Sequence, residues 1–325
     1  MDDSSVRRKR RIRFPKWLRI LLGSLIAAAA LYFLVNRLVR DWHQIPWSDI
    51  GLNVPLLVVS FAVLLVVYLP LFGFTWTVLL RTMGERLRLL DAVAIITVSQ
   101  MGKYLPGKIW FTLGRVYLAR RHGVPESKTA VSAFMEAGFA LLAALLLFAL
   151  SLLLVPRGNI PGSTYWAFAL VPLCIVVLHP RVLSPLVNLL LRKLKQPTID
   201  IRLTFGRTLS IIALYLAMWT AQGIGCFLLV NSFYPLTIDK LFIIVGGYAL
   251  AWILGFLSLV TPAGLGVREG ILTLAFGFAM PESVAILAAL LARVWITVAE
   301  ALAAAAMIVF LRRRKRRRSS GEEQA

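Results

Sequence analysis

Long apolar segments recur along this 325-residue chain and leave little sequence for a water-soluble fold. A helix needs about 20 mostly apolar residues to cross a bilayer. Six segments meet or approach that length: 18–37, 54–80, 129–155, 164–179, 208–232 and 282–310. Hydrophobic residues make up 59% of the chain, against about 45–50% in soluble proteins. The sequence therefore predicts an all-α polytopic membrane protein with about six full spans.

Two further apolar regions, 91–115 and 240–280, are interrupted by Pro, Gly and charged residues. The first contains YLPGKIWFTLGR and the second contains VTPAGLGVREG. Non-helical backbone at membrane depth is tolerated only where protein buries it or where it lines a wet cavity. We therefore expect two broken or re-entrant segments, which gives six to eight helices in all. The residues expected to break the helices are Pro106, Gly107, Pro262, Gly264 and Gly266.

The two interruptions are built alike, which suggests an internal repeat. A Pro-Glu-Ser tripeptide follows each of them, and Pro106 precedes Pro125 by the same 19 positions that separate Pro262 from Pro281. A long Ala/Leu-rich segment with one carboxylate comes next in both cases. Paired, interrupted hydrophobic segments point to a transporter binding site near the bilayer midplane. The alternative is coincidence, since Pro and Gly occur in many membrane helices.

Basic residues predict the orientation, because loops rich in Lys and Arg remain in the cytoplasm. The basic loops are 81–90, 115–128 and 180–207, and the loops with few basic residues are 41–53, 156–163 and 231–240. On this basis region 91–115 enters and leaves the membrane on the cytoplasmic side, and region 240–280 does so from outside. Units 54–155 and 208–310 are then oppositely oriented, as an inverted-topology repeat requires. Each broken segment is either a re-entrant loop or a pair of short spans.

Both tails are strongly basic and contribute much of the net charge of +21. Eight basic residues lie in 1–19, and 312–318 reads RRRKRRR. Such runs can bind nucleic acid, but here both adjoin apolar helices, where they anchor topology and attract anionic lipid headgroups. We expect no nucleic-acid partner. The predicted organisation is a basic cytoplasmic tail at 1–17, one transmembrane domain at 18–311 and a second basic cytoplasmic tail at 312–325.

Basic side chains surround both breaks and suit the binding of a phosphate headgroup whose tail remains in lipid. Lys103, Lys108 and Arg115 flank the first break, and Arg268 lies in the second. Arg binds phosphate through two parallel hydrogen bonds, so Arg115 and Arg268 are the leading candidates. For Lys103 and Lys108 the alternative is that they only reach towards the cytoplasmic interface.

Four more charged residues lie in apolar surroundings: Glu136, Glu269, Arg293 and Glu300. A charge at mid-helix costs about 2.5–3.5 kcal/mol on insertion scales, so these groups should face the bundle interior. Arg293 and Glu300 lie two turns apart on one face. We expect the four to gate a central cavity. The alternative is fixed structural ion pairs, such as Arg293 with Glu269 or Glu136 with Arg268.

The motifs GKYLPGKIWFTLGR and PAGLGVREG, each with its charged helix, resemble the lysylphosphatidylglycerol synthase transmembrane-domain family, also called flippase-like. The resemblance covers roughly 20–310. In bifunctional members, the multiple peptide resistance factors, this membrane part precedes a soluble aminoacyl-transferase domain and is taken to flip the aminoacylated lipid. These 325 residues contain no such domain. The resemblance therefore implies the flippase-type half. Stand-alone relatives are associated with polyprenyl-linked sugar, hopanoid or other lipid pathways, so no substrate is implied.

The sequence thus predicts a lipid flippase or transporter of the inner membrane that moves a phosphate-bearing lipid, a phospholipid or a polyprenyl-linked lipid. Its partners would be membrane lipids with anionic headgroups, and a separately encoded lipid-pathway enzyme. The alternative is a non-transporting accessory protein that anchors or regulates a lipid-modifying or glycosyltransferase enzyme. An intramembrane transferase ranks lowest, because no nucleophile or metal-ligand set is visible. We expect no enzymatic activity, no cofactor and no metal.

Overall fold

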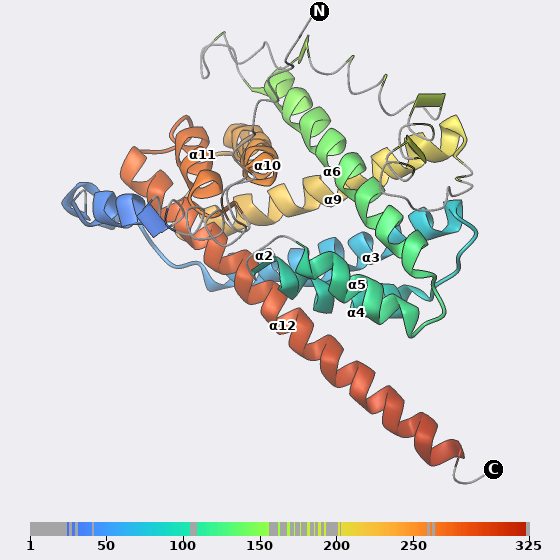
Figure 1. Cartoon of the computed structure of the whole chain (residues 1–325). Coiled ribbons are helices and arrows are strands. Elements are labelled where there is room, and N and C mark those ends of the chain that lie inside the picture. Colours follow the sequence, from blue (N-terminus) through green and yellow to red (C-terminus); the bar gives the residue numbers. More distant parts are fainter. Residues whose placement is uncertain are drawn as a thin grey trace, which may run out of the picture.

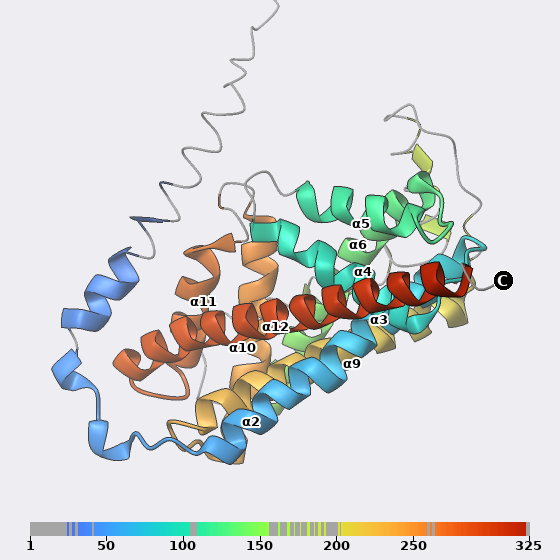
Figure 2. The ribbon, with the colours of Figure 1, turned by 90° about the horizontal axis from the view of Figure 1, so that it is seen from below.

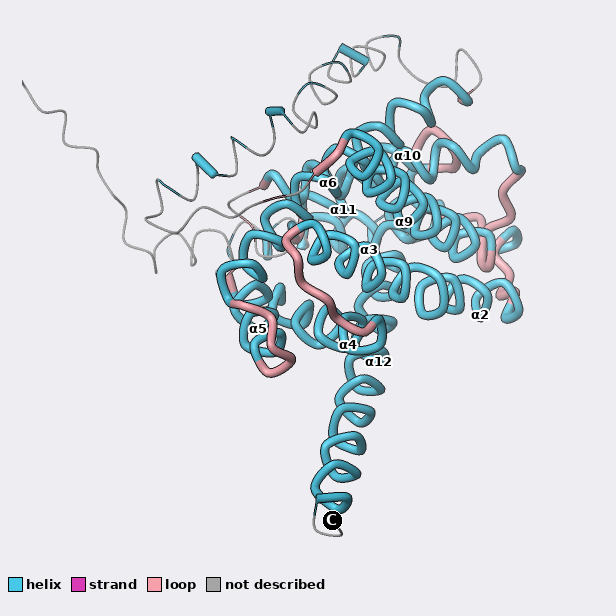
Figure 3. The backbone as a smooth tube through the Cα atoms, turned by 90° about the vertical axis from the view of Figure 1, so that its right-hand side faces the viewer, coloured by secondary structure: helices cyan, strands magenta, loops and turns pink. Residues whose placement is uncertain are grey.

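The computed structural model describes residues 32–40, 42–104, 109–155, 203–258 and 264–322, with isolated positions in 25–29 and 162–201 and at 261. Every regular element in these ranges is helical. Figure 1 shows a body of packed helices from which the last helix projects, and Figure 3 shows short loops between several of the helices. The predicted all-α membrane fold is confirmed.

The first long helix is continuous but contains one wide turn. It consists of α2 (Val54–Ala62), the π-helical turn Val63–Tyr68 and α3 (Leu69–Thr82). It begins where the Asn53 side chain accepts a hydrogen bond from the Leu56 backbone N–H at 3.1 Å, a common helix cap. Pro70 has no N–H to donate one turn back, and the wide turn ends just before it, with Leu69 bonded to the Leu64 carbonyl.

The first broken region forms two short helices. These are α4 (Leu89–Gln100), which ends in the 3-10 turn Met101–Tyr104, and α5 (Trp110–Arg120). With 12 and 11 residues they are about 18 and 16 Å long, too short to cross the bilayer alone. Helix α6 (Glu126–Leu154) follows with 29 residues.

The second half repeats this order. Helix α9 (Phe205–Asn231) is followed by α10 (Leu241–Leu257), α11 (Val267–Phe276) and α12 (Glu282–Glu322). Helix α11 has only 10 residues. Helix α12 has 41 residues and is therefore about 60 Å long, twice the hydrocarbon thickness of about 30 Å. It must extend well beyond the membrane on one side.

Five stretches of the described chain are long and apolar enough to cross a membrane: Val54–Thr82, Glu126–Leu154, Phe205–Asn231, Ile238–Leu257 and Glu282–Arg313. Four coincide with predicted spans. The fifth contains α10 and lies in the region predicted to be broken, where the sequence left short spans open as an alternative. Two predicted spans, 18–37 and 164–179, lie largely outside the described residues.

The two halves interlock. Helices α2 and α9 lie antiparallel (Figure 2). The backbone N–H of Gly51, just before α2, donates to the Phe233 carbonyl, just after α9, at 3.1 Å. The backbone N–H of Asn53 donates to the Ser232 carbonyl at 2.6 Å. Helix α12 packs against α4 of the first half, and α6 packs against α10 of the second half. Each half thus contributes its last helix to the broken region of the other. This arrangement favours the inverted repeat, which stays a prediction.

A glycine allows close approach at the same place in both halves. A Cβ at Gly73 of α3 would lie 3.0 Å from the Cα of Val93 in α4, and a Cβ at Gly223 of α9 would lie 3.1 Å from the Cα of Val245 in α10. Any larger residue would push these helix pairs apart. The glycines therefore hold each broken region tightly against its preceding long helix.

Candidate functional site

A cavity of about 190 Å³ lies where the two broken regions meet α6, α9 and α10. Both halves of the chain contribute to its lining. Its charged lining residues are Lys103, Glu136, Arg268 and Arg293. Its aromatic lining residues are Tyr68, Phe72, Phe111, Trp219, Trp252 and Phe256. The cavity combines three cations with broad apolar walls.

The aromatic wall is held in a defined orientation. The rings of Trp219 and Trp252 meet edge to face with centroids 4.5 Å apart, and Phe256 stacks on Trp252 at 5.1 Å. The Trp219 indole N–H donates to the Ala140 carbonyl at 2.9 Å. Because a buried indole N–H usually needs a partner, this bond fixes the ring against α6 and keeps the wall rigid.

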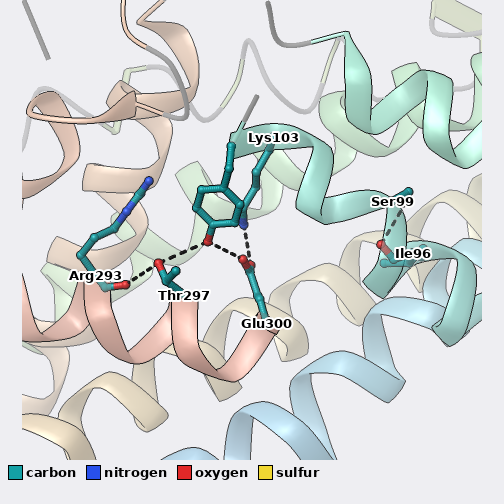
Figure 4. A network of polar contacts seen from close by, with 7 residues as sticks. Ile96, Ser99, Lys103, Arg293, Thr297 and Glu300 are labelled. Atoms are coloured by element: carbon teal, nitrogen blue, oxygen red, sulfur yellow. Dashed lines mark hydrogen bonds and ion pairs between the residues drawn. The ribbon is translucent and has the colours of Figure 1, made fainter. Parts of the chain in front are cut away.

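Lys103 is tied to the last helix. Its Nζ lies 2.5 Å from Glu300 Oε1, and the neighbouring Tyr104 hydroxyl donates to Glu300 Oε2 at 2.7 Å (Figure 4). The Tyr104 hydroxyl also lies 3.3 Å from Thr297 Oγ1, one turn before Glu300. The turn Met101–Tyr104 is therefore fastened to α12 by a carboxylate with two partners. This geometry argues against a Lys103 that merely reaches towards the interface, since its ammonium contacts a buried carboxylate.

Arg293 is tied to the second broken region. Its Nε lies 3.6 Å from Glu269 Oε1 of α11, and its guanidinium lies over the Tyr104 ring at 5.8 Å. This is one of the structural ion pairs that the sequence suggested. Arg293, Thr297 and Glu300 share one face of α12, as their spacing predicts (Figure 4). One face of α12 thus contacts the broken regions of both halves.

Glu269 occupies the start of its own helix. It is fully buried, and its Oε2 accepts the Gly266 backbone N–H at 2.6 Å. A helix N-terminus is a ready anion site, but in α11 a carboxylate of the chain already takes part of it. Gly266, the residue just before α11, has φ 82°, a conformation that favours glycine.

Arg115 lies behind the cavity wall. Its side chain is fully buried, Nη1 donates to Glu136 Oε2 at 2.6 Å, and the guanidinium stacks over Trp76 at 5.3 Å and Phe72 at 5.9 Å. The sequence suggested Arg268 as the partner of Glu136, but Arg115 takes that position because α5 packs directly against α6. Arg115 is thus placed to hold Glu136, and the cavity lining does not include it.

Arg268 has a different environment from the other three cations. Its guanidinium lies over the Tyr248 ring, 4.7 Å from the centroid, and none of the ion pairs found among the described residues involves it. It lines the cavity from the start of α11. A Cβ on Gly255 would lie 3.3 Å from the Arg268 Cβ, and one on Gly264, which has φ 70°, would lie 2.8 Å from the Gly255 carbonyl oxygen. The missing side chains of Gly255 and Gly264 therefore allow Arg268 and its loop to pack closely against α10.

The remaining predicted residues, Pro106, Gly107, Lys108 and Pro262, lie outside the described residues. The aromatic wall was not predicted, because Trp219 and Trp252 stand in ordinary apolar segments with nothing nearby to distinguish them. Tyr104 stands beside Lys103 in the sequence, but its bond to Glu300 depends on a residue 196 positions away. Within the described residues, no three His, Cys, Asp or Glu side chains form a group that could hold a metal ion.

Comparison with known families agrees with the motifs. The profile of the family described as the lysylphosphatidylglycerol synthase TM region matches residues 20–304. No curated protein is similar enough in sequence to count as a match. The matched range contains both broken regions and every residue of the cavity. Because the match covers most of the chain, this protein belongs to the lysylphosphatidylglycerol synthase transmembrane-region family.

Proposed function

We propose that this multi-pass membrane protein, a member of a family connected with lipid metabolism, is a flippase or transporter for a phosphate-bearing lipid. The observation that carries the proposal is the cavity between the two halves, into which Lys103, Arg268 and Arg293 project from three different elements. Charges within a membrane domain are costly and mark functional paths. A cavity with three of them suits an anionic group.

The size of the cavity suits a headgroup and not a whole lipid. Drug-sized ligands occupy pockets of about 300–1,000 Å³, and this cavity has about 190 Å³. The acyl or prenyl tails would therefore stay in the bilayer while the headgroup passes the cations. Arg268 is the leading headgroup ligand, because Lys103 and Arg293 already have carboxylate partners.

Movement of the headgroup would require the ion pairs to exchange partners. Helix α12 holds the first broken region through Glu300 and the second through Arg293. The phosphate would first bind Arg268 with the ion pairs intact. As it moves on from Arg268, it would compete with Glu300 for Lys103 on one path and with Glu269 for Arg293 on the other, and so loosen one attachment at a time. Alternate loosening of the two regions would give alternating access around a fixed site.

Reconstitution into vesicles tests the proposal. Tail-labelled fluorescent phosphatidylglycerol is incorporated, and dithionite bleaches only the outer leaflet, so the bleached fraction reports exchange between leaflets. We expect Arg268→Gln to slow exchange by about tenfold or more, because a hydrogen bond to a charged group contributes about 1.5–3 kcal/mol. Arg268→Lys should also slow it, since an ammonium cannot bind phosphate through two parallel bonds. Arg120→Gln is the control, because Arg120 is exposed and does not line the cavity.

The opposite result is equally clear. If Arg268→Gln and Glu300→Gln both exchange lipid at the parental rate, the cavity is not a transport site. The accessory-protein interpretation would then replace the flippase, and the chain would serve to anchor or regulate a separate enzyme.

A further inference from the structure

We infer that the cavity selects headgroups with one net negative charge, as a phosphodiester has, over headgroups with two negative charges or none. This inference rests on the proposed function, because it names the substrate class of the same cavity. It follows from the charge balance around the cavity.

Among the described residues, the cavity wall and its direct ion partners contain four cations and three carboxylates. The cations are Lys103, Arg115, Arg268 and Arg293, and the carboxylates are Glu136, Glu269 and Glu300. Each carboxylate is engaged by a different cation, at 2.6 Å for Glu136, 3.6 Å for Glu269 and 2.5 Å for Glu300. The cluster therefore has a net charge of +1, and Arg268 is its one cation that forms none of the ion pairs found among the described residues.

A single uncompensated cation in a membrane interior favours one counterion. The Tyr248 ring face attracts the Arg268 guanidinium, but a ring quadrupole supplies no net charge. One phosphodiester oxygen pair would neutralise the cluster and leave the three existing ion pairs intact. A bidentate contact from the guanidinium to two phosphate oxygens is the geometry that Arg favours.

Other headgroup charges fit less well. The second charge of a phosphomonoester would have to take Lys103 or Arg293 from its carboxylate, and breaking a buried ion pair leaves an uncompensated charge behind. The ammonium of a zwitterionic headgroup would enter a space lined by three cations, while the one carboxylate of the wall, Glu136, is already bonded to Arg115. The part of the headgroup beyond the phosphate should therefore be neutral.

Binding measurements on the purified protein in a neutral detergent test this inference independently of transport. Three short-chain lipids with the same dioctanoyl tails are compared through the concentration dependence of thermal stabilisation. Phosphatidylglycerol carries one negative charge and phosphatidylethanolamine none. Phosphatidate is a dianion at pH 8, since the second pKa of a phosphomonoester is about 6. We expect phosphatidylglycerol to bind about tenfold more tightly than either of the others, a difference of ~1.4 kcal/mol.

Variants then shift the charge balance by one unit in either direction. Arg268→Gln brings the cluster to zero and should reduce phosphatidylglycerol binding to the level of phosphatidylethanolamine. Arg268→Lys keeps the charge and should weaken binding while preserving the order of the three lipids. Glu300→Gln brings the cluster to +2 and should raise phosphatidate binding relative to phosphatidylglycerol. Arg120→Gln, outside the cluster, should leave all three affinities unchanged.

Equal affinity for the three lipids in the parental protein would overturn the inference, and that comparison needs no variant to fold. Selective binding of phosphatidylglycerol without leaflet exchange would support the inference and reject the flippase. Leaflet exchange together with equal affinity for the three lipids would support the flippase and reject the inference about charge.

Discussion

Lys103 and Glu300 lie 197 positions apart in the chain, and their side chains meet at 2.5 Å inside the helix bundle. One belongs to the first broken region and the other to the last helix, so this contact joins the two halves of the molecule. The exposed fractions of the two side chains, 28% and 7%, place the pair at the edge of the cavity rather than at the surface. Substitutions at this pair therefore test how firmly the halves are joined.

Removing one member of the Lys103–Glu300 pair should destabilise the protein more than removing both. Lys103→Met and Glu300→Gln should each cost about 3 kcal/mol, because each leaves a charge without its partner. The double variant should cost less than either single variant, and thermal unfolding of all four forms in detergent measures the difference. The exposed pair Arg120–Glu126 is the matched control, at a similar 2.7 Å but with exposed fractions of 74% and 57%. The interaction energy between Arg120 and Glu126, obtained from the same set of single and double variants, should stay below about 1 kcal/mol. Equal coupling in both pairs would contradict the prediction.

Arg115→Gln should impair folding rather than lipid selectivity. The Arg115 side chain is fully buried between Trp76, Phe72 and Glu136, so its loss leaves Glu136 unpaired and should cost about 3–5 kcal/mol. Adding Glu136→Gln should recover part of the melting temperature. If Arg115→Gln unfolds at the parental temperature but loses binding of phosphatidylglycerol, Arg115 contacts lipid directly and our placement of it behind the wall is wrong.

Gly264→Ala should displace Arg268 and weaken anion binding. A Cβ there would lie 2.8 Å from the Gly255 carbonyl oxygen, and the φ of 70° is unfavourable for alanine by about 1–2 kcal/mol. Gly270→Ala, two residues after Arg268, is the control, since a Cβ at Gly270 would have nothing within 4 Å and alanine favours a helix by about 0.5–1 kcal/mol. Binding of dioctanoyl phosphatidylglycerol should fall for Gly264→Ala alone. Equal affinity in the two variants would show that the segment around Gly264 can shift without displacing Arg268, and would contradict the prediction.

Gly73→Ala and Gly223→Ala should destabilise the protein by similar amounts. The new methyl group would press on Val93 in the first case and on Val245 in the second, and overpacking of this kind costs about 1–3 kcal/mol. Gly138→Ala in α6 has open space around it and should be neutral or stabilising. Melting temperatures in detergent provide the comparison. A neutral effect at one of the two sites would argue that the halves are not packed alike.

The sequence predicted the long helices well because their signal is local. The helix expected at 129–155 is α6, Glu126–Leu154, and its start follows from the Pro before Glu126. Apolar length and a start signal are both contained within about 30 neighbouring residues. The order of long helix, broken region and long helix in each half followed from the same kind of evidence.

The charged residues of the cavity stand out in the sequence, and the sequence suggested the Arg293–Glu269 pair, but it did not give the partners of Glu136 and Glu300. Their cost in lipid singles them out in the sequence, whereas the pairing of Arg115 with Glu136, and not Arg268, depends on how α5 packs against α6. Glu300 could have paired with any cation of the bundle. Contacts between residues so far apart are set by helix packing, which hydropathy and spacing do not record.

The π-helical turn Val63–Tyr68 also changes how the first long helix should be interpreted. An α-helix advances about 100° per residue, so one extra residue in a turn rotates everything that follows by roughly that angle relative to an unbroken helix. Tyr68 and Phe72 owe their inward direction to this offset, and so does Trp76. If the same residues formed a regular α-helix, the sequence and its hydropathy would be unchanged, but these three rings would be rotated by about that angle away from their present direction. The direction in which Tyr68 and Phe72 face the cavity is therefore set by the turn that begins at Val63.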